Sequence, residues 1–310
     1  MPDAPVHALA QATRALVARF QRQRPMRSGS LLITVLGDSI APRGGIVTLG
    51  SLIRLAEPFG VPERLVRTSV GRLAKDGWLT FRREGRQSEY FLTEHGRSRF
   101  AEATERIYSQ GPQSWDGGWT LLLLPPGPRA PRERIREELQ WLGFGQVSSG
   151  VLAHPSRSVA DTRELLTSLQ VGSGAVVMRA NSEGPTGDRT LLSAGWDLAE
   201  LARSYQQFTA SFTRVTNLLA GRSVAPAETA FVIRTLLIHE YRKIHLRDPL
   251  LPRSVLPKDW VGATAYELCR TLYRKVFASA EEHLSAVAET LGGKLPTLAR
   301  ETNRRFGGLH

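Results

Sequence analysis

Cysteine is almost absent from this sequence, since Cys269 is the only one among 310 residues. A single thiol cannot form a disulfide within the chain, which excludes the disulfide-stapled folds of small secreted proteins. Long apolar runs are missing too, because the leucine run at 121–124 is far shorter than the roughly 18–20 residues of a membrane span. The N-terminus mixes alanine and leucine with arginine and lacks a signal-peptide core. We therefore expect a cytoplasmic protein without a membrane partner.

The signature motifs of common enzymes and metal sites are also missing. The sequence has no G-x-S-x-G elbow, no P-loop and no dinucleotide-binding fingerprint. Cys269 lies in an apolar helical stretch, where an inert buried thiol is expected rather than a nucleophile. His239 and His245 are six residues apart, which does not place two metal ligands on one helix face. The sequence therefore calls for no catalytic residue, metal ion or resident cofactor.

Acidic residues are scarce relative to basic ones, and the formal net charge is +12. Residues 1–100 contain 16 Lys and Arg against 8 Asp and Glu, so one third of the chain carries two thirds of the excess charge. This concentration predicts an N-terminal module that faces phosphate or an acidic surface. A generally arginine-rich proteome is the alternative explanation, but it does not predict the clustering.

A chain of this length is too long for one ordinary core, and two or three domains are expected. We expect the α+β fold class, with an N-terminal winged helix-turn-helix, a central ferredoxin-like α+β domain and a C-terminal helical domain. The "SQGPQSWDGG" stretch at 109–118 has the Gly/Pro/Ser composition of a linker. The expected segments are a leader over 1–27 with a helix at 5–22, the winged helix over 28–110, the central domain over 115–190 and the helical domain over 191–310.

Residues 28–93 have the element order of a winged helix. A helix is expected over 28–41, although "LLITVL" alone could also be a strand. Ser28 and Thr48 are expected to cap the first two helices. A third helix is expected over 62–76, with Gly77 as its stop.

A charged hairpin is expected after this third helix. "WLTFRR" and "SEYFLT" flank "EGRQ" as two strands flank a turn, with Leu79 and Phe81 facing the core. Thr93 then caps a further helix.

The outward face of the 62–76 helix is the candidate recognition surface. An inward stripe recurs at helical spacing and is formed by Leu65, Val66, Ser69, Val70 and Leu73. The second helix of a helix-turn-helix enters a major groove about 12 Å wide, and the planar arginine fork pairs with two acceptors at once. The alternative is a solvated helix face with a hairpin used for protein contacts. The predicted DNA contacts are Arg64, Arg67, Thr68, Ser69, Arg72 and Lys75 on the helix, although Ser69 also belongs to the inward stripe, and Arg82, Arg83 and Arg86 on the hairpin.

Beyond the linker, three predicted strands alternate with two predicted helices. "WTLLLLPPG", "VSSGVLAHPS" and "AVVMRAN" are the strands, and this alternation at this length favours a small ferredoxin-like domain. Mostly helical sequence follows, with helices expected at 197–219, 226–246, 260–290 and 295–306. A proline-rich but apolar connection at 247–262 is expected to be ordered.

Three stretches resemble the PaaX family, the repressors of phenylacetic acid degradation. They are "VPERLVRTSVGRLAKDGWL", the "WDL" stretch at 196–208 and "HEYRKIHLRDPLLPRSVLPKDWVG" at 239–262. The resemblance covers almost the whole chain. It implies a homodimeric bacterial repressor that binds double-stranded operator DNA and is released by the effector phenylacetyl-CoA or by a different acyl-CoA. It also implies a central domain similar to CRISPR-associated ferredoxin-like nucleases, but no acidic metal site supports nuclease activity here.

Binding of an acyl-CoA effector requires cationic and aromatic side chains near each other. The candidates are His239, Arg242, Lys243, Arg247 and Trp196. The alternative is a structural polar network that fixes the proline-rich loop. Two other functions stay open, namely an enzyme acting on CoA thioesters and a winged-helix scaffold that binds only proteins.

Overall fold

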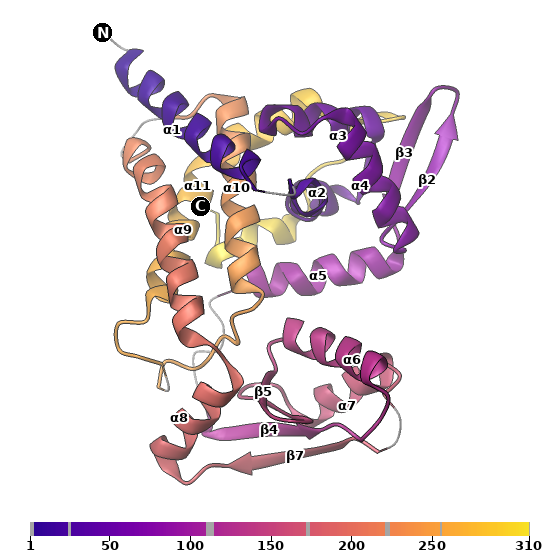
Figure 1. Cartoon of the computed structure of the whole chain (residues 1–310). Helices are drawn as coiled ribbons and strands as arrows, with labels where there is room; N and C mark the ends of the chain where they lie inside the picture. Colours follow the sequence, from indigo (N-terminus) through magenta and orange to yellow (C-terminus); the bar gives the residue numbers. More distant parts are fainter. Residues whose placement is uncertain are drawn as a thin grey trace. The chain divides into compact units, whose positions relative to one another are not determined.

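The computed structural model describes residues 3–23, 26–109, 115–171, 174–220, 224–254 and 256–309. The chain, drawn in Figure 1, divides into two compact units and combines helices with small antiparallel sheets. Unit 1 contains 1–109, 207–242 and 265–310, and unit 2 contains 110–206 and 243–264. In the part of the chain so described, no helix is long and apolar enough to cross a membrane.

Unit 1 begins with α1 (Asp3–Gln21), which lies within the expected leader. Its inner face is apolar and buried, since Leu9 and Phe20 are 4% and 1% exposed. The Phe20 ring meets Phe59 edge to face, with ring centroids 6.5 Å apart. The helix is therefore part of the core of unit 1.

The next helix, α2 (Ser28–Val35), continues through a π-helical turn (Leu36–Ile40), which confirms the helical interpretation of this apolar run. Its expected cap is wrong. The N-cap position is Arg27, no side chain caps the helix, and Ser28 is already its first residue. The elements that follow are the 3₁₀ turn Ala41–Arg43, β1 (Ile46–Thr48), α3 (Leu49–Ala56), the 3₁₀ turn Glu57–Phe59 and α4 (Glu63–Lys75).

The other expected boundaries of these helices are confirmed. The Thr48 hydroxyl accepts a hydrogen bond from the Ser51 amide at 3.2 Å and so caps α3. The Thr93 hydroxyl accepts one from the Gly96 amide at 3.0 Å and so caps α5 (Glu94–Tyr108). Gly77 follows α4 with a φ of 74°, a left-handed conformation that glycine adopts without steric cost.

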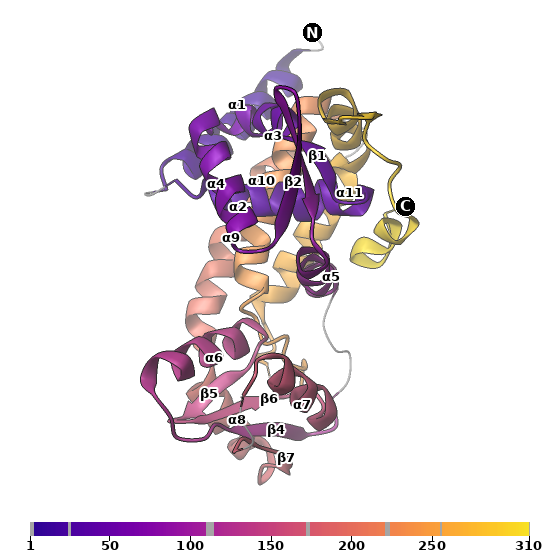
Figure 2. The same cartoon turned by 90° about the vertical axis from the view of Figure 1, so that its right-hand side faces the viewer.

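The expected hairpin is formed by β2 (Leu79–Glu84) and β3 (Gln87–Leu92), and β1 joins it in the order β1-β3-β2. Figures 1 and 2 show the β2–β3 hairpin projecting beside α4. Leu79 is buried, as expected, but the expected inward position of Phe81 is wrong, because that side chain is 56% exposed. The core ends near Leu79, and the strands continue past it.

The C-terminal part of unit 1 is helical. It contains the second half of α9 (Leu198–Leu218), most of α10 (Ala227–His245) and most of α11 (Val261–Val287). The last of these ends earlier than expected, and a short hairpin follows, formed by β8 (Glu289–Thr290) and β9 (Gly293–Lys294). The expected helix at 295–306 is instead a 3₁₀ segment (Arg300–Gly307), which kinks at Arg305 and Phe306.

Unit 2 contains a four-stranded antiparallel sheet with the order β5-β6-β4-β7. The strand order and the β-α-β-β-α-β succession fit the expected ferredoxin-like domain. The single strand expected at "VSSGVLAHPS" is wrong. Gly150, with a φ of 81°, makes a turn there that separates β5 from β6. The elements are β4 (Gly118–Leu123), α6 (Arg129–Trp141), β5 (Gly145–Ser148), β6 (Val151–His154), α7 (Val159–Ser168), β7 (Val176–Asn181) and α8 (Gly184–Gly195), of which α8 was not expected.

Each face of this sheet has its own apolar core, because successive strand residues point to opposite sides. Leu122 and Leu152 pack with Leu139 of α6 and Leu166 of α7. The opposite core consists of Trp119 and Ala153 with Leu192 and Leu251, joined by Trp196 and Leu256. The second core shows that the proline-rich connection is packed, as expected.

Candidate nucleic-acid interface

The outward face of α4 is basic and exposed because the opposite face is anchored in the core. Val66 and Val70 are fully buried, and Leu73 is 7% exposed. The predicted contact residues other than Ser69 are exposed, and on α4 they are Arg64, Arg67, Thr68, Arg72 and Lys75. A helix with one apolar stripe necessarily presents its other side to solvent or to a partner.

Ser69 is the predicted DNA contact that does not lie on this surface. It is 7% exposed, and its hydroxyl oxygen lies 3.3 Å from the hydroxyl oxygen of Ser28. The Ser28–Ser69 hydrogen bond joins α2 to α4. Ser69 is therefore a packing residue, as its membership of the inward stripe indicated.

The basic side chains divide into paired and unpaired groups. The Arg67 guanidinium donates to the Glu63 carboxylate one turn earlier, with Nε 2.7 Å from Oε1. Arg82 also has an ion-pair partner. The remaining basic side chains among the predicted contacts form no ion pair within the described part of the chain, and they are Arg64, Arg72, Lys75, Arg83 and Arg86. Five cationic groups are thus available to an external anion.

Arg82 has a structural partner in the hairpin. It forms an ion pair at 2.8 Å with Glu89, whose side chain is only 2% exposed, and its guanidinium lies 5.4 Å from the centre of the Phe91 ring. Glu89 also accepts a hydrogen bond at 2.6 Å from the amide of Leu291, in the β8–β9 hairpin. Arg82 therefore neutralises a buried carboxylate, while Arg83 and Arg86 lie nearer the turn.

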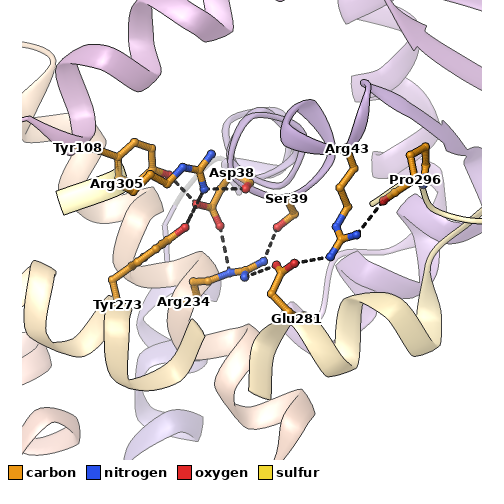
Figure 3. Close-up of polar contacts among 9 residues, drawn as sticks. All are labelled: Asp38, Ser39, Arg43, Tyr108, Arg234, Tyr273, Glu281, Pro296 and Arg305. Atoms are coloured by element: carbon orange, nitrogen blue, oxygen red, sulfur yellow. Dashed lines mark hydrogen bonds and ion pairs between the residues drawn. The ribbon is translucent and has the colours of Figure 1, made fainter. Parts of the chain in front are cut away.

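Unit 1, which carries this surface, also contains a buried ionic network centred on Asp38 (Figure 3). The Asp38 carboxylate forms ion pairs with Arg234 at 3.1 Å and with Arg305 at 2.9 Å. It also accepts hydrogen bonds from the hydroxyls of Tyr108 at 2.5 Å and Tyr273 at 2.8 Å. The π-helical turn after α2 is thereby bound to α5, α10, α11 and the C-terminal 3₁₀ segment.

A second carboxylate extends this network. Glu281 of α11 accepts from Arg234 at 2.6 Å and pairs with Arg43 of the 3₁₀ turn (Figure 3). Burial disfavours the charged guanidinium of Arg234, but Asp38 and Glu281 outweigh burial and raise its pKa above the ordinary value. Burial also raises the pKa of the Tyr273 hydroxyl. Within this network Arg234 is therefore held in its charged form and Tyr273 in its neutral form.

Two of the predicted ligand residues instead connect α10 to α2. His239 is fully buried, and its Nδ1 lies 3.3 Å from the Thr34 hydroxyl. Arg242 donates to the Thr34 hydroxyl at 2.8 Å and to the Ser30 carbonyl and hydroxyl at 2.7 Å. Burial lowers the pKa of Arg242 to about 10. These contacts fit the alternative of a structural polar network, although the element that they fix is α2 rather than the proline-rich loop.

The other three predicted ligand residues belong to unit 2. Trp196 donates from Nε1 to the Gly143 carbonyl at 3.3 Å, and its ring centroid lies 6.0 Å from that of Trp119. Lys243 is half-buried, and Arg247 is exposed. A role of any of these five residues in binding a ligand stays a prediction.

The network residues were not identified from the sequence. Two of them nevertheless carried a signal, because Asp38 and Arg234 are single charges within the apolar stretches "LLITVLGDSI" and "AFVIRTLLI". A lone charge in such a setting requires a buried partner. Pairing these opposite charges across about two hundred residues required the tertiary structure.

Two other kinds of site were considered from the sequence, a reactive cysteine and a metal site. Cys269 is fully buried, and burial raises the pKa of its thiol well above the ordinary value. Among the residues placed by the structure, no three histidine, cysteine, aspartate or glutamate side chains gather as a metal ion would need.

Comparison with known proteins places this chain in one family. Three family models match successive segments: PaaX-like protein over 27–96, the PaaX protein central Cas2-like domain over 112–192 and the PaaX-like protein C-terminal domain over 196–286. The Transcriptional repressor PaaX of Escherichia coli (strain K12) is 37% identical over 291 residues, which are 92% of each chain. The solved structure of the uncharacterized protein Rv0674 from Mycobacterium tuberculosis matches 74% of this chain and 89% of its own, at 20% identity and a TM-score of 0.45. The chain belongs to the PaaX family.

Proposed function

We propose that this chain is a transcriptional repressor that binds double-stranded operator DNA through a winged helix-turn-helix. The helix-turn-helix is formed by α3 and α4, and the wing is the β2–β3 hairpin. The observation that carries the proposal is the exposed basic face of α4, where the arginine and lysine side chains Arg64, Arg72 and Lys75 form no ion pair within the described structure. Unpaired arginines beside a projecting hairpin suit a polyanion with grooves.

The two parts of this surface have different roles in the proposal. Arg64 and Arg72 lie on the helix that enters the major groove, where a guanidinium pairs with two acceptors of guanine. Arg83 and Arg86 lie on the wing, where they contact phosphates and fix the register without reading sequence. Arg82 contributes less to DNA binding because Glu89 already neutralises it.

The family supports repression and a role in aromatic catabolism. The Escherichia coli relative is named a transcriptional repressor, and the family is not known as one of enzymes. By this likeness we assign the chain to the control of phenylacetate catabolism genes. Catalytic turnover of CoA thioesters is the competing function, and a scaffold that binds only proteins is another.

We further propose that the repressor is a homodimer and that phenylacetyl-CoA releases it from DNA. Two winged helices in a dimer match two half-sites, so a change in their spacing lowers affinity. A ligand can shift this equilibrium only by its different affinities for the two states. The Asp38 network supports such coupling, because α10 and α11 are bound directly to the turn that follows α2.

Fluorescence anisotropy with a labelled duplex from the chain's own promoter tests the proposal. We expect tight binding that phenylacetyl-CoA releases and that free phenylacetate or free CoA leaves intact. Tight binding without release would keep the repressor and discard this effector, and a panel of other acyl-CoA thioesters would then identify the ligand. Thioester hydrolysis in the same mixture would favour the enzyme, and DNA affinity that is independent of salt would favour the scaffold.

A further inference from the structure

Gly71 lies at the centre of the outward face of α4. Successive helix residues are about 100° apart, so residues two positions apart point to nearly opposite sides. Its neighbours at that distance, Ser69 and Leu73, are both buried. Gly71 is exposed and is flanked on its own face by Thr68 and Lys75, three residues before and four residues after it.

A glycine in this position costs stability. Glycine is the least favourable residue in a helix interior apart from proline, since its backbone loses the most conformational freedom. Gly71 is the ninth of the thirteen residues of α4, away from both ends of the helix. Its φ is outside the left-handed range, so alanine could adopt the same conformation.

The rest of the protein supplies no steric reason for this glycine. A β-carbon built at Gly71 meets no neighbouring heavy atom within 4 Å, apart from the helix's own local backbone. Three other glycines in helical segments do have such a reason. A β-carbon would lie 2.7 Å from the Phe100 ring at Gly37, 2.3 Å from the Trp78 carbonyl at Gly96 and 2.4 Å from the Trp260 indole nitrogen at Gly262.

We infer that Gly71 is the point of closest approach between α4 and duplex DNA. The missing side chain leaves bare helix backbone between the basic side chains, so the helix can lie deeper in the major groove and its arginines can reach base edges. This inference rests on the proposed function, because it assigns the contact to DNA. It adds a positioning residue that bears no charge and donates no side-chain hydrogen bond.

The test measures stability and DNA affinity in the same variants. Gly71→Ala should raise the melting temperature by about 2–4 °C, since alanine is the better helix former. It should weaken binding to the promoter duplex by about 5- to 150-fold, the range expected when one well-formed base contact is lost. Gly71→Leu, with a larger side chain, should weaken binding further and keep the thermal gain.

Ser98→Ala is the matched control, because Ser98 is an exposed helix residue in α5 and is not one of the predicted DNA contacts. It should raise the melting temperature slightly and leave DNA affinity unchanged. Undiminished promoter binding by both Gly71 variants would overturn the inference while the proposed function stands. A melting temperature that falls in Gly71→Ala would also overturn it, since the glycine would then serve the fold. Equal binding of promoter and scrambled duplexes by the native protein would overturn both.

Discussion

Asn in place of Asp38 is expected to destabilise unit 1 strongly. The Asp38 side chain is 2% exposed and neutralises two guanidinium groups, Arg234 and Arg305, whose side chains are 0% and 4% exposed. Removing one partner of a buried ion pair leaves an uncompensated charge and costs about 3–5 kcal/mol. The substitution keeps the size of the side chain, so a cavity contributes little.

The remaining contacts place the expected loss near the lower end of this range. Arg234 keeps Glu281 at 2.6 Å and the Ser39 hydroxyl at 2.8 Å. Arg305 keeps the Asp38 carbonyl at 3.0 Å and the Tyr273 hydroxyl at 2.7 Å. We therefore expect a loss of about 3 kcal/mol in the free energy of unfolding, which lowers the melting temperature by about 6–12 °C.

Thermal unfolding followed by circular dichroism measures this loss, and amide hydrogen exchange in α10 and α11 assigns it to unit 1. Asp116→Asn is the matched control, because this carboxylate also pairs with an arginine, Arg179, but is 70% exposed. An exposed ion pair contributes little, so the control should melt close to the native temperature. The reasoning would be refuted if the Asp38→Asn and Asp116→Asn variants melted at the same temperature.

Three further outcomes are expected. Arg83→Ala should make the negative slope of log affinity against log salt shallower by about 0.9, since one phosphate contact is lost. An unchanged slope would show that this residue does not contact DNA. Arg82→Ala should lower the melting temperature more than Arg83→Ala does, because it leaves Glu89 buried without its cation; equal melting would show that this pair is not structural. Burial raises the pKa values of Tyr108 and Tyr273 above the ordinary 10.0, so the stability that they contribute is present below pH 10 and lost above it. The melting temperature of Tyr108→Phe should therefore fall less than that of the native protein as the pH rises above 10. An identical dependence of melting temperature on pH in the two proteins would contradict this.

Local patterns predicted much of unit 1. The inward stripe of α4, the caps Thr48 and Thr93 and the hairpin all follow from residues that act over one turn or one strand pair. Phe81 shows the limit of such patterns. Alternation assigned it to the same face as Leu79, but only the tertiary structure shows where the core beneath that face ends.

The sequence predicted the exposed basic surface of the candidate site but not the buried network around Asp38. Exposed arginines follow from the periodicity of one helix, whereas the partners of Asp38 are distant in sequence, on α5, α10, α11 and the last 3₁₀ segment. The same limit applies to His239 and Arg242. Their clustering in sequence suggested a shared ligand, but in the structure both side chains contact Thr34 of α2.

The most direct test of the account is the affinity of the native protein for a promoter duplex and for a scrambled duplex of equal length, measured at several salt concentrations beside Arg72→Ala. We expect the native protein to prefer the promoter and to lose affinity steeply with salt. Arg72→Ala should lose about 1–3 kcal/mol on the promoter and much less on the scrambled duplex. Equal affinity of the native protein for both duplexes, or an equal loss on both in the variant, would contradict sequence-specific recognition through α4.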